Sequence, residues 1–182
     1  SYYEGNSTIF LVKCGGKDFA VGLDDLKELN SFGINAGGGR LSLNGGNPVT
    51  NVVGSIVPVE QQDGSVAYVA VNNGANSVMY KLDGKGLQKT QKIELKVTSN
   101  AEKILLTKNG EILHISPQGL NVYTANGSST KFKYFCPFFS TPGGWSQQFV
   151  DSVTLMDVGG NQEALIGTGP KGIEYFPVSD KC

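Results

Sequence analysis

Residues 103–123, KILLTKNGEILHISPQGLNVY, decide the fold class of this chain. Two apolar runs in this stretch flank Asn109-Gly110, and a third apolar run ends at Tyr123. Asn-Gly supplies the positive φ angles that a tight hairpin turn demands. The stretch therefore predicts short antiparallel strands joined by turns.

The same pattern recurs along the chain. Equivalent glycine turns lie at residues 15–16, 63–64 and 159–160, so successive turns are separated by 46 to 50 residues. A period of this length, built from short strands and hairpins, is typical of propeller blades.

The predicted strands are short and rich in β-branched and aromatic residues. They cover residues 8–12, 19–23, 65–71, 77–82, 91–97, 103–107, 111–116, 120–124, 131–135, 149–156, 163–166 and 172–178. The best helical candidate, 23–29, is too short to pack as a layer of its own. The first repeat fits least well, because residues 23–49 are long and glycine-rich, and we expect an irregular terminal blade there.

We therefore predict a single all-β domain over residues 1–182, a small β-propeller of about four blade-like repeats. The repeats lie at about 6–50, 51–97, 98–135 and 148–182, with a loop rich in proline, glycine and aromatic residues at 136–147. A five-bladed propeller and an irregular β-sandwich are the alternatives.

On these residues the chain resembles the strand-turn-strand repeats of β-propeller families. Residues 67–74, AYVAVNNG, look like blades of lactonase-type propellers, and the fourth repeat looks like those of integrin-type and adhesin propellers. Where the latter carry an aspartate-rich calcium loop, residues 157–161, DVGGN, offer one carboxylate, so no metal site is predicted. Hemopexin-type four-bladed propellers offer a parallel of layout alone.

Composition limits the classes of partner. The chain has 15 basic and 16 acidic residues without a basic patch, so we expect neither nucleic acid nor membrane insertion. A chain that opens with Ser1 is compatible with removal of a leader peptide, and sequons at Asn6 and Asn126 are compatible with secretion and glycosylation. The sequence thus favours a secreted or extracellular glycoprotein.

Three cysteines suggest one disulfide bond. A bond between Cys14 and Cys182 would tie the first repeat to the last and close a ring. The alternative is two unpaired thiols. Cys136 is then left over: it could be a buried free thiol, replace one partner in that bond, or link two chains as a dimer, which could also form non-covalently.

Motifs for catalysis and cofactors are weak. Residues 167–172, GTGPKG, have the spacing of a dinucleotide loop, but a strand rather than a helix follows, so they are interpreted as a hairpin and no cofactor is predicted. His114, the sole histidine, is interpreted as a partly buried strand residue, with a histidine-serine triad as the alternative. Carboxylates that could serve a glycosidase are Asp24, Asp25, Glu28, Asp151 and Asp157.

Aromatic residues mark the candidate ligand site. Phe138, Phe139 and Trp145 lie in the 136–147 loop, where rings could contact a ligand or plug the fold. Tyr2 and Tyr3 pose the same choice. The sequence favours a secreted, lectin-like, non-enzymatic module that binds protein or carbohydrate through propeller loops. A lactonase-like or glycosidase-like hydrolase is the alternative, followed by a structural coat or matrix protein.

Overall fold

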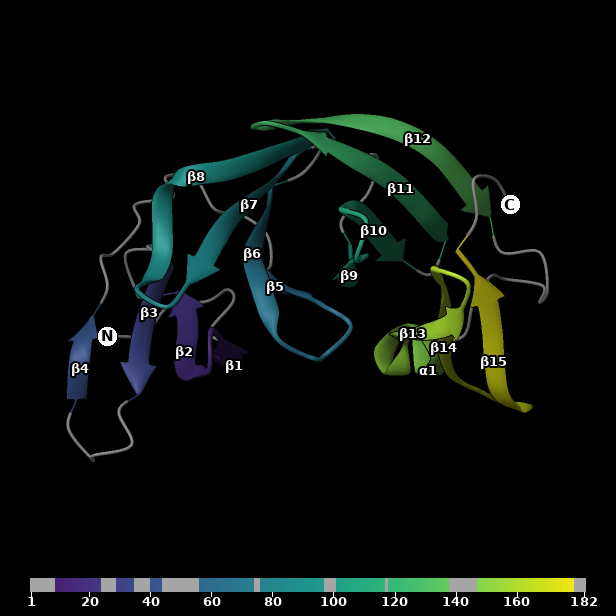
Figure 1. The fold of residues 1–182 in the computed structure, drawn as a ribbon, viewed down its shortest axis with the longest axis horizontal. Helices are drawn as coiled ribbons and strands as arrows, with labels where there is room; N and C mark the ends of the chain where they lie inside the picture. The colour runs from purple at the N-terminus through teal and green to yellow at the C-terminus, as the bar shows by residue number, and fades with distance from the viewer. Residues whose placement is uncertain are drawn as a thin grey trace. The chain divides into compact units, whose positions relative to one another are not determined.

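The computed structural model describes residues 9–23, 29–34, 40–43, 56–73, 76–96, 101–116, 118–137 and 147–178. These residues form fifteen strands and one short helix, so the predicted all-β class is confirmed (Figure 1). None of the described sheets closes on itself. The sequence predicts one domain, and this stays a prediction. The chain is described in two compact units: unit 1 is 1–60 with 64–100, and unit 2 is 61–63 with 101–182.

Unit 1 contains two antiparallel meanders of four strands each, in which neighbouring strands follow one another in the chain. The strands of the first are β1 (Ile9–Cys14), β2 (Lys17–Leu23), β3 (Leu29–Ile34) and β4 (Arg40–Leu43). Those of the second are β5 (Ile56–Glu60), β6 (Val66–Asn73), β7 (Asn76–Asp83) and β8 (Gly86–Lys96). Strands β3, β4 and β5 were not among the predicted strands. The helical candidate at 23–29 is wrong at both ends, because Leu23 closes β2 and Leu29 opens β3.

One apolar cluster joins the two meanders of unit 1. Phe19 and Val21 from β2 pack in the same buried cluster as Val69 and Val71 from β6. Alternate residues of a strand point to the same face, so both pairs lie on one face of their strands. Burial of these faces is the main stabilising contribution in this unit.

Unit 2 contains an antiparallel meander of four strands, a three-stranded antiparallel sheet and one short helix. Its elements are β9 (Lys103–Leu106), β10 (Glu111–Ser116), β11 (Gly119–Asn126), β12 (Ser129–Pro137), α1 (Gln147–Ser152), β13 (Thr154–Gly159), β14 (Gln162–Gly169) and β15 (Gly172–Pro177). Strands β9 to β11 come from the stretch that predicted the fold, and Ile112 pairs with both Leu106 and Tyr123 across them.

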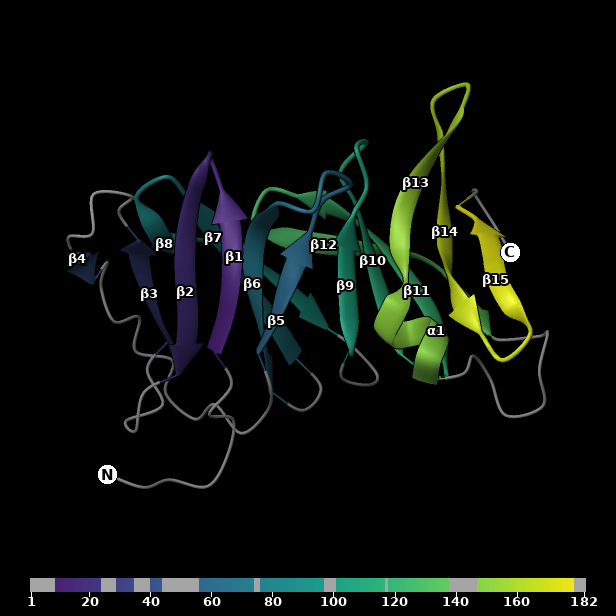
Figure 2. The ribbon, with the colours of Figure 1, turned by 90° about the horizontal axis from the view of Figure 1, so that it is seen from below.

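The prediction of a strand over 149–156 is wrong in its first half, where α1 forms. Phe149 and Val150 of α1 are buried in the apolar cluster of unit 2 with Leu113 and Leu165. Figure 2 shows α1 beside β14, where the absent side chain of Gly167 makes room for the Phe149 ring. The helix therefore forms because it allows both neighbouring apolar side chains to pack into the core.

The four predicted glycine turns are confirmed as hairpin turns. They connect β1 with β2, β5 with β6, β9 with β10 and β13 with β14. Gly110 has a φ of 84° and Gly159 a φ of 91°, in the region that favours glycine.

Candidate functional site

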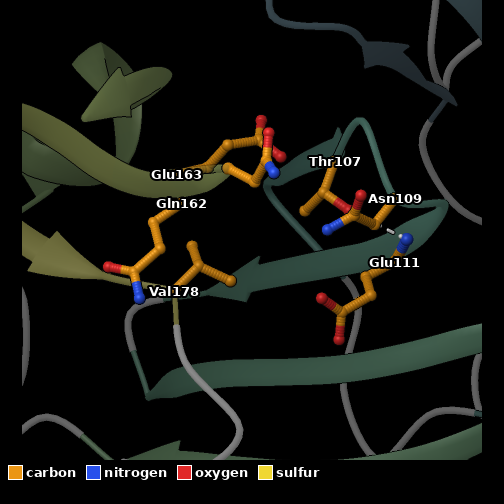
Figure 3. Close-up of a pocket in the computed structure, with 7 residues that line it drawn as sticks. Thr107, Asn109, Glu111, Gln162, Glu163 and Val178 are labelled. Atoms are coloured by element: carbon orange, nitrogen blue, oxygen red, sulfur yellow. Dashed lines mark hydrogen bonds between the residues drawn. The ribbon is translucent and has the colours of Figure 1, made fainter. Parts of the chain in front are cut away.

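The candidate site is a polar pocket of unit 2, at the turn ends of two hairpins. It has a volume of about 230 Å³ and is lined by Thr107, Asn109, Glu111, Asn161, Gln162, Glu163 and Val178. Figure 3 shows Glu163 and Gln162 on one side, with Thr107, Asn109 and Glu111 on the other. The lining side chains are carboxylates, amides and a hydroxyl, apart from one valine.

The β9–β10 turn forms one wall of the pocket and is held by its own hydrogen bonds. The amide of Gly110 donates to the carbonyl of Thr107 at 3.0 Å, and the amide of Thr107 donates to the carbonyl of Glu111 at 2.9 Å. The Thr107 hydroxyl accepts a further bond from the Glu111 amide at 2.9 Å. The turn therefore presents Asn109 from a fixed backbone.

The β13–β14 turn forms the other wall. Asn161 takes a positive φ of 61° directly after two glycines, which turns the chain tightly into β14. Asp157 accepts a hydrogen bond from the Gly159 amide at 2.9 Å and pairs with the Lys108 ammonium at 3.1 Å. These contacts, the Gly159 bond first, lower the pKa of Asp157, so its carboxylate remains charged near neutral pH.

Glu163 is the most unusual residue of the pocket, because it is charged and yet only 5% exposed. Its Oε1 accepts a hydrogen bond from the backbone amide of Lys108 at 3.0 Å, so its carboxylate faces the β9–β10 turn. Its Oε2 is buried and has no hydrogen-bond partner among the described residues. Buried polar atoms are usually satisfied, so this oxygen points to a function.

Two lysines near the pocket are held in ion pairs. The ammonium of Lys108 pairs with Asp157, and that of Lys133 on β12 pairs with Glu111 at 2.9 Å. Lys108 thus contacts the second hairpin twice, through its backbone amide and its side chain. Neither of these ammonium groups is paired with Glu163.

The predicted aromatic site cannot be located. Tyr2, Tyr3, Phe138, Phe139 and Trp145 all lie outside the described residues. Their role in ligand binding stays a prediction.

Of the two predicted glycosylation sites, the structure describes one. Asn6 lies outside the described residues, whereas Asn126 ends β11 at the hairpin turn to β12. The next residue, Gly127, has a φ of 63° in this turn. Glycosylation at both positions stays a prediction.

The structure does not form the expected disulfide bond from Cys14. Cys14 is a buried free thiol, and its Sγ donates a hydrogen bond to the carbonyl of Leu82 at 3.1 Å. The thiol is thus occupied within unit 1. Cys136 is disulfide-bonded and 1% exposed, and Cys182 lies outside the described residues.

His114 is buried in β10, which confirms the interpretation as a strand residue. Its ring lies edge-on to Tyr123 at 6.3 Å, and neither ring nitrogen has a hydrogen-bond partner in the described part of the chain. Burial lowers the pKa of His114 to about 4. The described residues supply no serine partner for a triad, so the geometry gives no support to that alternative.

The carboxylates singled out from sequence do not form a pair in the described residues. Asp24, Asp25 and Glu28 lie outside them, Asp151 accepts a hydrogen bond from Gln147 at 2.9 Å, and Asp157 pairs with Lys108. The pocket instead brings together Glu111 and Glu163, which sequence reasoning missed. The available signal was that each acid lies close behind a predicted glycine turn: Glu111 directly follows Gly110, and Glu163 lies three residues after Gly160.

Two further features bear on chemistry. Residues 167–172 form the turn end of the β14–β15 hairpin, in which Gly169 pairs with Gly172, so the interpretation of this segment as a hairpin is confirmed. Within the described ranges, no three or more histidine, cysteine or acidic side chains are grouped to bind a metal ion. The described helix is also too short and polar to span a bilayer.

Comparison with known proteins gives one informative similarity. No family model matches the chain. Over all 182 residues the chain is 72% identical to "Salivary gland surface protein 1" of Aedes aegypti, of whose length it spans 5%.

Proposed function

We propose that this chain is a segment of a larger secreted surface protein and that it binds carbohydrate through the polar pocket of unit 2. Secretion is supported by the name of the Aedes aegypti relative, a salivary gland surface protein, to which the chain is 72% identical. Because the chain spans 5% of that relative, the proposal concerns this segment alone.

A β-propeller remains our proposal for the scaffold. Its support is that three runs of four consecutive strands form antiparallel meanders: β1 to β4, β5 to β8 and β9 to β12. Strands β13 to β15 form a shorter meander of the same kind. Meanders of four strands are the unit from which propeller blades are built.

The single observation that carries the binding proposal is the composition of the pocket. Two acids and three amides converge there from two hairpin turns, and binding residues are often placed on loops held by a rigid scaffold. Amides both donate and accept hydrogen bonds and carboxylates accept them, which suits the hydroxyl groups of a sugar. A volume of about 230 Å³ lies below the usual range for drug-sized ligands, so a single sugar unit fits better than an extended chain.

The aromatic loop extends this proposal. Trp145, Phe138 and Phe139 would supply the flat apolar surface on which a sugar ring can pack, while the pocket would fix one unit by hydrogen bonds. Trp145→Ala is expected to weaken glycan binding at least tenfold without loss of the far-ultraviolet circular dichroism of the strands. An unchanged affinity would remove the loop from the site.

A glycan array with purified chain tests the proposal. We expect saturable binding to a subset of glycans, and Gln162→Ala should weaken it because Gln162 is an exposed amide of the pocket. Gln118→Ala is the matched control, since Gln118 is an exposed amide at the β10–β11 turn and is not part of the pocket lining. Absence of glycan binding, or equal loss in both variants, would contradict a carbohydrate site in this pocket.

Alternative functions can be tested with the same purified chain. A protein ligand would be captured from tissue extract without binding to the array. A hydrolase would release product from a bound glycan, and the observation that favours this reading is that Glu111 and Glu163 line one pocket. Against it, Glu111 is held in an ion pair with Lys133 at 2.9 Å. A coat or matrix role would give neither binding nor turnover.

A further inference from the structure

We infer that Oε2 of Glu163 accepts a hydrogen bond from a ligand hydroxyl, so that this pocket selects neutral sugars over acidic ones. This inference rests on the proposed function and names the residue that sets its specificity. The carboxylate is held in place by the Lys108 amide on its other oxygen, Oε1, at 3.0 Å.

A ligand donor is inferred because Oε2 of Glu163 accepts no hydrogen bond from a described residue. Glu163 is 5% exposed, and no described residue donates a hydrogen bond to its Oε2. A buried acceptor without a donor costs free energy, which a ligand donor would recover on binding. Neither Lys108 nor Lys133 supplies that donor, since their ammonium groups pair with Asp157 and Glu111.

The chemistry of the other lining residues narrows the class of ligand. Asn109, Asn161 and Gln162 present amides, which both donate and accept. A metal ion needs only acceptors, and the described residues hold no group of three acidic, cysteine or histidine ligands. A ligand carboxylate or sulfate would bring acceptor oxygens against the unpartnered oxygen of Glu163, which needs a donor, so a neutral polyhydroxyl ligand fits best.

Three of the side chains that line the pocket with Glu163 are free to change conformation. Asn109, Asn161 and Gln162 line the same pocket and are exposed, and exposed side chains change rotamer within nanoseconds. The inference requires that such side-chain movement admits a ligand hydroxyl to Oε2, while the backbone of both turns keeps its hydrogen bonds.

Glu163→Gln tests the inference with little change in shape. The Lys108 amide still requires an acceptor, so the glutamine oxygen would take the place of Oε1 and its NH₂ group the place of Oε2. A donor would then face the ligand hydroxyl where an acceptor stood. Hydrogen bonds to charged groups are worth roughly tenfold to hundredfold in affinity, so we expect a loss of that size for neutral sugars.

The probes are methyl glycosides in matched pairs, glucose with glucuronic acid and galactose with galacturonic acid, measured by titration calorimetry or nuclear magnetic resonance. The wild type should bind the neutral member of a pair at least tenfold more tightly, and Glu163→Gln should shrink that ratio to within about threefold. Gln118→Ala should leave the ratio unchanged. A panel of singly deoxygenated sugars on the wild type gives the same information if Glu163→Gln does not fold, because removal of one hydroxyl should then cost at least tenfold.

The outcomes separate the two proposals. Three results would overturn the role of Glu163 and leave carbohydrate binding intact. The wild type could bind neutral and acidic sugars equally well, the deoxygenated panel could contain no sugar whose affinity falls tenfold, or a folded Glu163→Gln variant could keep the wild-type ratio of affinities. Failure of the wild type to bind any sugar, either here or on the array, would overturn both.

Discussion

The buried histidine makes the stability of unit 2 sensitive to acid. His114 has its pKa lowered from 6.5 to about 4 by burial, so the unfolded chain takes up this proton before the folded one does. The contribution of His114 to stability is therefore fully present above pH 6.5 and is lost as the pH falls toward about 4. Linkage between these two pKa values gives a loss of about 2 kcal/mol at pH 5 and about 3 kcal/mol at pH 4, relative to pH 7.

Replacement of the imidazole isolates this effect. His114→Leu keeps an apolar side chain of similar size in β10 and removes the titrating group, and His114→Gln removes it while keeping polarity. Urea unfolding of wild type and both variants at pH 7, 5 and 4, followed by circular dichroism, gives the free energies. Hydrogen exchange of peptides from β9 to β12 reports on unit 2 itself.

The decisive quantity is the difference between each variant and the wild type, because carboxylates common to all three chains cancel in it. We expect that difference to shift in favour of each variant by about 3 kcal/mol between pH 7 and pH 4. A difference that stays constant within about 0.5 kcal/mol in both variants would show that His114 titrates normally in the folded chain and would refute the reasoning.

Three further predictions concern covalent structure and packing. Under native non-reducing conditions Cys14 should resist alkylation until the chain is unfolded, whereas Cys136 should appear in a disulfide-linked peptide; a linked Cys14 peptide would contradict the assignment. Gly167→Ala should lower stability by about 1–3 kcal/mol in thermal unfolding, because its new methyl group would lie 2.9 Å from the Phe149 ring, and an unchanged melting temperature would argue against that contact. Chain secreted from eukaryotic cells should lose mass on treatment with a glycan amidase if Asn126 is glycosylated, and an Asn126→Gln variant should lack that part of the mass change.

The hairpins could be predicted from sequence because their causes are local. Glycine at residues 110 and 159 permits the positive φ of the turns, and the apolar residues on either side form the strands they join. Strands β3 and β4 were missed because their segment is glycine-rich, and because the alternation of apolar and polar residues is absent in β3 and covers only four residues in β4.

The helix could not be predicted for a different reason. Residues 147–156 contain a short apolar pattern that suits either a strand or a helical turn, and periodicity cannot separate the two over so few residues. Packing decides between them, since Phe149 and Val150 both reach the core of unit 2 from α1.

The pocket lies beyond local reasoning altogether. Thr107 and Glu163 are 56 positions apart in the chain, and only the pairing of two hairpins through Lys108 brings them together. Glu163 is covered through that contact, and the residues that flank it in the sequence do not signal that it is buried. Sequence placed acids next to turns, but it could not show which acid would be covered.

The thiol of Cys14 has a consequence for how such a chain can mature. Burial, with a smaller contribution from Asp83, raises the pKa of Cys14, so little of it is thiolate near neutral pH. Thiolate is the form that attacks a disulfide, and the surrounding core also blocks access to this sulfur. Once unit 1 has folded, Cys14 is thereby withdrawn from thiol–disulfide exchange.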